Sequence, residues 1–307
     1  MNHEQPVAVI GAGLMGHGIA YLFAAGGHPV RVQDPSSASL ESLPSRVGAI
    51  CRLLGTAESE ILARLRATTS LPAAVEDAQL VVEAAPERLE LKQQLFGEIA
   101  RHVPATAILA SNTSVIPIHS ICAGLTRVER IVGAHFWNPP HLVSLVEVVM
   151  MGEAQRPAAE ALIGLLRALG RHPVLVRRDV PGCIGNRLQH ALKREAIALV
   201  AAGMCDAETL DEVVRFGFGA RLAVLGPLEQ SDLVGLDLTK NIHDVLMPDL
   251  DVTARTHPYL EELVSRGELG MKTGKGFRRW TPAGAQAVRD RLSAYLALNA
   301  ARERGKE

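Results

Sequence analysis

A short apolar run that ends in a glycine-rich turn is the feature that most restricts how this chain can fold. Val7–Ile10 is followed directly by Gly11, Gly13 and Gly16 in the sequence GAGLMG, and a stretch with helical spacing comes next. In such a turn the first glycine permits a tight bend, the second lets a pyrophosphate approach the backbone, and the third lets the helix pack close to the strand. The phosphates then meet the positive N-terminus of the helix. The pattern predicts a dinucleotide-binding βαβ unit.

An acidic residue stands at the end of the next strand-like run. Val30–Gln33 is followed by Asp34, close to the spacing of about 20 residues at which a ribose-binding acid is expected. A carboxylate at this place would accept hydrogen bonds from both adenosine ribose hydroxyls and would repel a 2′-phosphate. We therefore expect NAD rather than NADP as the cofactor. The alternative is a glycine-rich turn that happens to lie beside an Asp-Pro turn.

The first part of the chain alternates between strand-like and helix-like segments. Helices are predicted at Met15–Ala25 and Glu90–Ala100. Further strands are predicted at Leu80–Glu83, Ala107–Ala110, Ile131–His135, Leu145–Val149 and Pro173–Arg177. Strands that alternate with helices predict a parallel sheet covered on both faces.

From about Pro181 the strand-like runs disappear. Helices are predicted at Gly185–Val200, Ala207–Phe216, Gln230–Leu246 and Pro282–Leu298. We therefore expect an α/β fold class, with an N-terminal Rossmann NAD-binding domain over residues 1–180 and an all-α C-terminal domain over residues 181–307. A chain of 307 residues is long enough for two such domains.

Composition and charge exclude several classes of function. The formal net charge is −1 without any basic block, so no nucleic-acid partner is expected. The four cysteines are scattered without metal-ligand spacing, which predicts free thiols in a reducing cytoplasm and no metal site. Residues 7–30 carry no Asp, Glu, Lys or Arg, but six glycines interrupt them, so no membrane span is expected.

Two residues in the following segments are candidates for acid–base chemistry. His135 closes an apolar strand, at the edge of the sheet where ligands bind in this kind of fold. Glu147 lies within the aliphatic run Leu145–Val149, where an ionised carboxylate is costly without a partner. A buried glutamate near a histidine suggests a paired base, in which the carboxylate orients the imidazole and the imidazole takes the proton. Each residue by itself could equally be a satisfied polar group, so spacing alone leaves the assignment open.

Motifs spread over nearly the whole chain resemble those of the L-3-hydroxyacyl-CoA dehydrogenases and their lambda-crystallin and carnitine dehydrogenase relatives. They are GAGLMG at 11–16, VEA at 82–84 with Glu87 and Lys92, SNTS at 111–114, HFWNPP at 135–140, LVEVV at 145–149, PGCIGNR at 181–187 and LGMKTGKGF at 269–277. The resemblance implies an NAD-dependent oxidoreductase of fatty acid metabolism that acts on a CH–OH group. It also implies a homodimer formed through the C-terminal domain.

The resemblance implies roles for individual residues as well. His135 matches the general base, and Glu147 matches its orienting carboxylate. Ser114 matches the residue that bonds the 3-oxygen of the substrate, and Asn186 matches the residue that completes the substrate site. The residues expected at the cofactor are Gly11, Gly13, Leu14, Met15, Gly16, Asp34, Glu87, Lys92, Asn112 and Asn138.

One departure from the family pattern puts CoA binding in doubt. The segment Pro35–Gln79 is shorter than the helical hairpin of the acyl-CoA members and contains no lysine. It keeps arginines, among them Arg46, Arg52, Arg64 and Arg66. Arginine can pair with a phosphate, so these side chains could still meet CoA.

Other departures lie nearer the expected substrate. The second proline of HFWNPP, together with Gln189 and Glu195, is more like the lambda-crystallin branch. His141 either caps a surface turn or faces the substrate. Arg221 either clamps a free carboxylate or is a solvated loop residue.

The leading interpretation is oxidation of a 3-hydroxyacyl-CoA, in which His135 removes the hydroxyl proton while C3 passes a hydride to the nicotinamide. The alternative is a dehydrogenase for a free 3-hydroxy acid or related secondary alcohol without CoA. A third interpretation, a structural or NAD-sensing crystallin-like protein, predicts a degraded catalytic set. A fourth is the dehydrogenase family with a catalytic lysine on the interdomain helix; Lys193 lies on such a helix, but HFWNPP and LVEVV have no place in that scheme.

Overall fold

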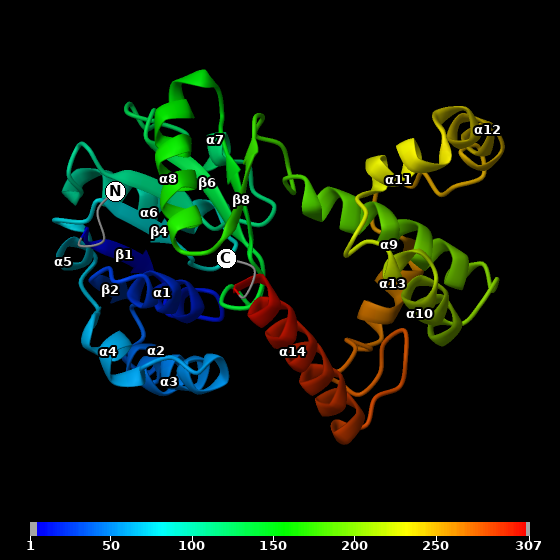
Figure 1. The fold of residues 1–307 in the computed structure, drawn as a ribbon, viewed down its shortest axis with the longest axis horizontal. Helices are drawn as coiled ribbons and strands as arrows, with labels where there is room; N and C mark the ends of the chain where they lie inside the picture. The colour runs from blue at the N-terminus through cyan, green and yellow to red at the C-terminus, as the bar shows by residue number, and fades with distance from the viewer. Residues whose placement is uncertain (1–4, 305–307) are drawn as a thin grey trace. The chain divides into compact units, whose positions relative to one another are not determined.

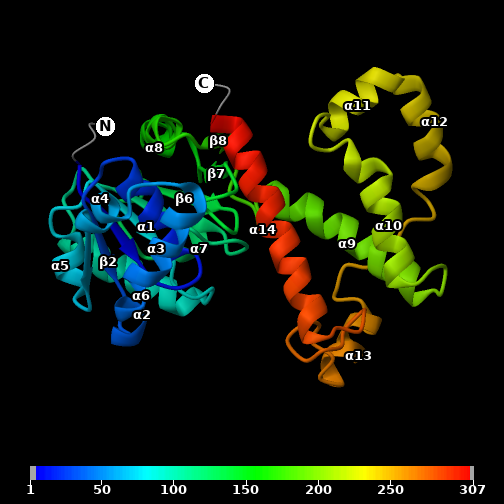
Figure 2. The ribbon, with the colours of Figure 1, turned by 60° about the horizontal axis from the view of Figure 1, so that its bottom comes forward.

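The computed structural model describes residues 5–304 and divides into two compact units. The first unit runs to Arg187 and takes up the chain again from Leu292, and the second comprises Leu188–Arg291. Figure 1 shows the first unit as a sheet with flanking helices, and Figure 2 shows that the second contains helices and loops. The predicted fold class is confirmed.

The first unit is built on an eight-stranded sheet in the order β3-β2-β1-β4-β5-β6-β7-β8. The strands are β1 Val7–Ile10, β2 Val30–Gln33, β3 Leu65–Thr68, β4 Leu80–Glu83, β5 Ile108–Ser111, β6 Ile131–Phe136, β7 Leu145–Val149 and β8 His172–Val176. The chain leaves β1 toward β2 on one side and returns to β4 on the other. This reversal opens a crevice at the carboxyl ends of the central strands, which is where ligands bind in such sheets.

Helices cover both faces of the sheet. They are α1 Gly16–Ala25, α2 Ser37–Glu41, α3 Leu43–Leu54, α4 Glu58–Ala63, α5 Leu71–Val75, α6 Leu89–His102, α7 Ile118–Ile121 and α8 Arg156–Ala168. Apolar side chains of α1, α3 and α8 share one buried cluster with Val7 and Val9, whereas α5, α6 and α7 share another with Ala8 and Ile10. Successive strand residues face opposite sides, so a strand buried on both faces is apolar throughout.

The prediction of a parallel sheet is wrong for one pair of strands. β6 and β7 run antiparallel, while the other neighbouring pairs are parallel. The connection between them, residues 137–144, contains no helix and is shorter than the dozen or so residues that a parallel crossover needs. The strand β3 was not predicted, because Arg66 and Ala67 of this edge strand are exposed and give no apolar run.

The second unit is helical. Its elements are α9 Gly185–Ala201, α10 Ala207–Phe216, α11 Pro227–Val234, α12 Leu236–Leu246, α13 Pro258–Ser265 and α14 Pro282–Arg304, of which α9 begins and α14 ends in the first unit. The single helix predicted over Gln230–Leu246 is wrong, because the chain breaks at Gly235, whose φ is 100°. Within residues 5–304, we find no helix with both the length and the apolar character needed to cross a bilayer.

Candidate active site

In the glycine-rich turn between β1 and α1, a side chain would clash at two of the three glycines and would meet free space at the third. Gly11 has φ 102°, and a Cβ there would lie 2.8 Å from the carbonyl oxygen of Ala84. A Cβ on Gly16 would lie 1.7 Å from the carbonyl oxygen of Gly11, whereas a Cβ on Gly13 would meet no atom within 4 Å. The neighbouring Leu14 is 68% exposed. The turn therefore leaves a cradle at the helix N-terminus that a dinucleotide phosphate fits.

Two charged side chains bind the backbone of Ala12, one at its N–H and the other at its carbonyl oxygen. Asp34 accepts from the backbone N–H of Ala12 at 2.8 Å and from that of Ser36 at 2.9 Å. Arg46, on α3, donates from Nη2 to the carbonyl oxygen of Ala12 and, at 3.4 Å, to that of Gly13. From its sequence Arg46 is either a CoA contact or a solvated arginine of an amphipathic helix, and only its position on the helical segment after β2 points to this contact.

A buried ionic network follows β4. The ammonium of Lys92 lies 2.7 Å from Glu83 Oε1 and 3.4 Å from Glu87 Oε2, and its side chain is 1% exposed. The other oxygen of Glu83 accepts from the Ser111 hydroxyl at 2.6 Å. Because Lys92 is buried, its positive charge is compensated by the carboxylates of Glu83 and Glu87 and not by solvent.

Glu87 fixes the turn that contains Ser114. Its Oε1 accepts from the Thr113 hydroxyl at 2.6 Å and from the backbone N–H groups of Ser114 and Val115 at 2.9 and 3.0 Å. Burial by itself raises the pKa of Glu87, but these hydrogen bonds and the charge of Lys92 outweigh it and lower the pKa below its usual value. The carboxylate therefore stays ionised and keeps the SNTS turn in one conformation.

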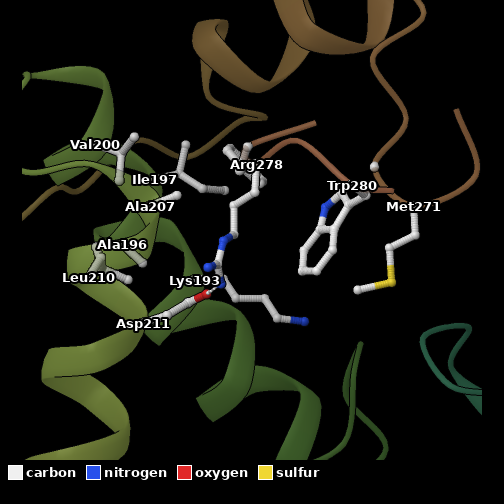
Figure 3. A pocket seen from close by; sticks show the side chains of 12 residues that line it. Lys193, Ala196, Ile197, Val200, Ala207, Leu210, Asp211, Met271, Arg278 and Trp280 are labelled. Atoms are coloured by element: carbon white, nitrogen blue, oxygen red, sulfur yellow. Dashed lines mark hydrogen bonds and ion pairs between the residues drawn. The ribbon is translucent and has the colours of Figure 1, made fainter. Parts of the chain in front are cut away.

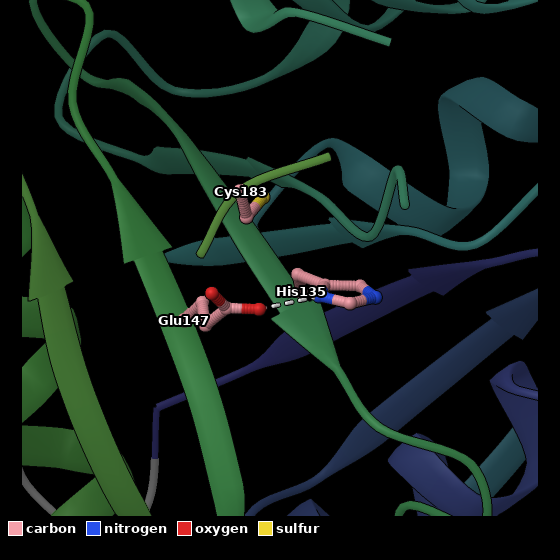
Figure 4. A group of neighbouring side chains, drawn as sticks. All are labelled: His135, Glu147 and Cys183. Carbon is pink, nitrogen blue, oxygen red and sulfur yellow. Dashed lines mark hydrogen bonds and ion pairs between the residues drawn. The ribbon is translucent and has the colours of Figure 1, made fainter. Parts of the chain in front are cut away.

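His135, near the carboxyl end of β6, and Glu147, on β7, form a buried pair (Figure 4). The antiparallel register of β6 and β7 sets the two residues directly opposite each other. Nδ1 of His135 lies 2.9 Å from Oε2 of Glu147, and the residues are 5% and 1% exposed. The indole Nε1 of Trp137 donates to the same oxygen at 3.3 Å. If Nδ1 carries the proton that this bond requires, Nε2 is left as an acceptor.

The other oxygen of Glu147 is held by the start of α9. The backbone N–H groups of Ile184 and Gly185 donate to Oε1 at 2.8 and 3.0 Å. Two successive residues with positive φ, Gly182 at 80° and Cys183 at 49°, curl the chain just before these amides. Burial raises the pKa of Glu147, but the bonds from His135 and the two amides outweigh it and lower the pKa. The carboxylate is therefore an anion held at a helix N-terminus.

Cys183 lies beside this pair, with its sulfur within 4.8 Å of their ligand atoms (Figure 4). Burial, together with the charges of Glu147 and Asp179, raises the pKa of the thiol to about 12. The thiol of Cys183 therefore stays protonated and lines the site, and it does not act as a nucleophile. It shares one small hollow with His135 and Ser114.

Asn186, in the first turn of α9, is tied to the SNTS turn. Its Nδ2 donates to the carbonyl oxygen of Ser114 at 3.0 Å. The four residues expected to be catalytic are thus connected, since Asn186 directly follows the amides that hold Glu147. Among the residues expected at the cofactor, Asn112 accepts from the backbone N–H of Phe136 at 2.9 Å, and Asn138 is exposed.

Of two further residues considered for the substrate, His141 belongs to the first unit but does not line this hollow, and Arg221 belongs to the second unit. His141 is half-buried, with its ring edge-on to Tyr21 at 6.5 Å, and it does not line the hollow. Burial, and then electrostatic interaction with His17 and Arg171, lower the pKa of His141 to about 4. Arg221 is exposed in the second unit.

Comparison with known proteins gives matches over both units. Residues 6–180 match the NAD-binding domain of 3-hydroxyacyl-CoA dehydrogenase, and residues 182–280 match the C-terminal domain of 3-hydroxyacyl-CoA dehydrogenase. The chain is 37% identical over 287 residues to 5-formyl-3-hydroxy-2-methylpyridine 4-carboxylate 5-dehydrogenase of Mesorhizobium japonicum, covering 92% of this chain and 93% of that protein. It is 36% identical over 291 residues to the mitochondrial hydroxyacyl-coenzyme A dehydrogenase of Homo sapiens, covering 89% and 90%.

Solved structures give a similar result. The crystal structure of a 5-formyl-3-hydroxy-2-methylpyridine 4-carboxylic acid 5-dehydrogenase, described as an NAD⁺-dependent dismutase, matches with a TM-score of 0.90 and 33% identity, covering 99% of this chain and 100% of that one. The (S)-3-hydroxybutyryl-CoA dehydrogenase of Ralstonia eutropha matches with a TM-score of 0.76 and 31% identity, covering 91% and 99%.

Proposed function

The chain belongs to the 3-hydroxyacyl-CoA dehydrogenase family of NAD-dependent oxidoreductases that act on a CH–OH group, and on that basis we propose that it oxidises a 3-hydroxy group to the 3-keto product, with His135 as the general base. The observation that carries the proposal is the buried pair of His135 and Glu147, whose Nδ1 and Oε2 atoms lie 2.9 Å apart. A neutral imidazole oriented by an ionised carboxylate is suited to take a proton from an alcohol.

Each side chain has a separate task in this reaction. NAD, when bound, supplies the acceptor for the hydride. Nε2 of His135 takes the hydroxyl proton, and Glu147 stabilises the imidazolium that results. The hydroxyl of Ser114 and the amide of Asn186 hold the substrate oxygen as its charge changes.

We assign the cofactor site to the turn between β1 and α1 and to the carboxylate after β2. Gly13, Leu14 and Met15 receive the pyrophosphate at the open side of the turn, and Asp34 receives the adenosine ribose. Glu87 acts through the SNTS turn, and the buried Lys92 acts through Glu87. The proposed contacts of Asn112 and Asn138 with the cofactor stay predictions.

The arginines of residues 35–79 favour a substrate without CoA. Arg52 pairs with Glu58 at 3.1 Å. Arg64 donates to the carbonyl oxygen of Glu60 at 3.2 Å, and Arg66 donates to those of Ala63 and Leu65 at 3.1 and 2.9 Å. Arg46 is bound at the glycine-rich turn, and its helix α3 packs on α1. Arg52, Arg64 and Arg66 thus have local partners, and Arg46 is directed to the glycine-rich turn of the cofactor site.

We therefore place a small free 3-hydroxy acid, or a related secondary alcohol, ahead of an acyl-CoA as the substrate. The high TM-score to an enzyme named for a pyridine carboxylate supports this order. The second candidate is a 3-hydroxyacyl-CoA, which is supported by the identity to the human hydroxyacyl-coenzyme A dehydrogenase.

A substrate panel separates the two candidates. NADH formation is measured with free 3-hydroxybutyrate, L-gulonate and carnitine, and NADH consumption with acetoacetyl-CoA and its pantetheine analogue. We expect turnover of a free acid and little difference between the CoA thioester and the pantetheine analogue. A kcat/KM for acetoacetyl-CoA well above that of both the analogue and the free acids would establish the CoA candidate instead.

The second unit supports a homodimer. Of the hydrophobic residues between Leu188 and Arg291, only Ala207, Leu263 and Ala285 are buried. Large apolar side chains that are more than 60% exposed include Val213, Phe216, Val224, Leu228, Leu233 and Val245. An exposed apolar surface of this extent is typical of an interface.

A hollow of about 430 Å³ forms part of this surface (Figure 3). Ile197 of α9, Leu210 of α10, Met271 and Trp280 are among the residues that line it, and Lys193 lies at the same place. We propose that a second copy of the chain covers these side chains. Light scattering after size-exclusion chromatography should give the molar mass of a dimer. The substitution Val224→Asp should lower this mass toward that of a monomer. A monomeric wild-type chain at micromolar concentration would contradict this.

A further inference from the structure

We propose that Arg46 is a specificity-determining residue of the cofactor site, which contacts the adenosine end of NAD and would bind the 2′-phosphate of NADP once the charge of Asp34 is removed. The proposal goes beyond the reaction described above, since it concerns which nucleotide the site accepts. The N–H of Ala12 is bound by Asp34, and the carbonyl oxygen of the same residue is bound by Arg46.

The guanidinium is fixed at this place by the packing of its helix. Leu43 and Val47 of α3 are buried in the same apolar cluster as Ile19 and Phe23 of α1. Nη2 of Arg46 then reaches the carbonyl oxygens at the turn. Since α1 starts from the same turn, the cation stands beside the helix N-terminus that attracts phosphate.

The charge of Arg46 is left without a counter-ion. Within residues 5–304 it forms no ion pair, and its buried Nε has no hydrogen-bond partner, whereas Arg52 on the same helix pairs with Glu58 at 3.1 Å. A half-buried cation with spare donors is stabilised by an anion, and the guanidinium fork matches a phosphate.

The nearest other titratable cation at the turn does not compete for that anion. His17 has its Nδ1 at 2.9 Å from the carbonyl oxygen of Gly13. Burial lowers the pKa of His17, and the charge of Arg46 lowers it further against the opposing effect of that carbonyl. The imidazole is therefore neutral at pH 7, and Arg46 supplies the positive charge.

Asp34 decides which nucleotide can use this cation. Its carboxylate is held by the N–H groups of Ala12 and Ser36, so it cannot turn away from a 2′-phosphate. With NAD the carboxylate and the guanidinium meet a neutral ribose, whereas with NADP the repulsion by Asp34 opposes the attraction by Arg46. Selectivity for NAD thus depends on a charge that excludes NADP rather than on the absence of a group that could bind it.

Binding experiments on the apo-enzyme test this without relying on turnover. Kd values for NADH and NADPH are measured by calorimetry for wild type, Asp34→Asn, Arg46→Gln and the double variant. Glutamine is uncharged and about two bonds shorter than arginine, so Arg46→Gln removes both the charge and the bond to the carbonyl oxygen of Ala12, and the Kd for NADH reports the loss of that bond. Arg52→Gln on the same helix is the matched control.

We expect Asp34→Asn to bind NADPH at least about tenfold more tightly than wild type, because the repulsion by the carboxylate is removed and the guanidinium can form a charge-assisted bond with the phosphate. The double variant should lose this gain, and Arg52→Gln should change neither Kd. Arg46→Gln alone should weaken NADH binding severalfold. If the double variant binds NADPH as tightly as Asp34→Asn, or if Asp34→Asn gains nothing, Arg46 is only a brace for the turn and the proposal is wrong. Unfolding temperatures measured in parallel identify any variant that is misfolded. If Arg46→Gln is misfolded, Arg46→Lys replaces it. Because lysine keeps the positive charge, we expect Arg46→Lys to retain part of the NADPH binding.

Discussion

Trp137 and Gly185 are in such close contact that a Cβ atom on Gly185 would lie 2.4 Å from Cζ2 of the indole. The indole ring lies tilted against the imidazole of His135, with 5.5 Å between ring centroids. Its Nε1 reaches the same oxygen of Glu147 that His135 uses. The absence of a side chain at the first residue of α9 therefore permits a fourth donor to the carboxylate, beside His135 and the two backbone amides.

Replacing Trp137 by phenylalanine should shift the pH dependence of the reaction. An aromatic ring would remain, but Oε2 of Glu147 would lose the hydrogen bond from the indole. The carboxylate would then interact more strongly with the imidazolium form of His135, which cannot act as a base. The acid limb of the kcat/KM profile should therefore move to higher pH by roughly 0.5 unit, since a weak hydrogen bond is worth about 0.5–1 kcal/mol and one unit about 1.4 kcal/mol. An unchanged profile would show that the indole serves packing only.

The base itself is tested by His135→Gln. We expect kcat to fall by roughly 10²–10⁴-fold, because the proton acceptor is lost, while the Kd for NADH stays nearly unchanged. Stopped-flow turnover and fluorescence titration measure the two quantities. Retention of near-wild-type kcat would show that another group takes the proton.

Glu147→Gln should reduce kcat less than His135→Gln, because the carboxylate orients the base and does not transfer the proton. It should also change how stability depends on pH. The lowered pKa of Glu147 stabilises the folded chain above the pKa of an unfolded glutamate, and this contribution is lost as the pH falls through the lowered value. Denaturant unfolding between pH 3 and pH 7 should thus be less pH-dependent in Glu147→Gln than in wild type. Parallel curves for the two proteins would contradict the ionised carboxylate.

Asn186→Ala should lower kcat/KM and leave the Kd for NAD unchanged. The substrate oxygen would lose a donor worth about 1–3 kcal/mol, and the SNTS turn would lose the bond of 3.0 Å to the carbonyl oxygen of Ser114. Steady-state kinetics and calorimetry of NAD binding separate these effects. Normal turnover would place Asn186 outside the substrate site.

Cys183 should resist alkylation in the native protein. With a pKa of about 12, only roughly one thiol in ten thousand is ionised at pH 8, and the thiolate is the reactive form. Iodoacetamide treatment at pH 8 followed by peptide mass spectrometry should find Cys183 unmodified until the protein is unfolded. Rapid modification of native protein would contradict both the burial and the raised pKa.

Much of the fold could be predicted because its strands are buried on both faces. Val7–Ile10 is recognisable as a continuous apolar segment and Val30–Gln33 by its alternating valines, and the structure gives both strands the predicted bounds. The reversal of β7 could not be predicted in this way, since an apolar strand gives no indication of its direction. Gly235 was overlooked because one glycine in a periodic segment costs a helix only about 1 kcal/mol.

The candidate site, like the fold, could be predicted from the sequence only in part. His135 and Glu147 could be selected as residue types in unusual places, but their contact depends on the register of β6 and β7. The amides of Ile184 and Gly185 have no side-chain signature, and they reach Glu147 from 37 and 38 residues further along the chain. Arg46 was misjudged because an arginine on an amphipathic helix is more often solvated, and only the packing of α3 on α1 brings it to Ala12.

The pairing of β6 with β7 makes the length of their connection part of the active site. Side chains alternate between the two faces of a strand, so an insertion or deletion of one residue within 137–144 that moved the pairing by one position would replace Glu147 opposite His135 by Val146 or Val148. Substitutions within residues 138–144 that keep the residue count would leave this register intact. Loop grafts between relatives, and any evolutionary drift in this connection, are therefore constrained in length more strictly than in composition.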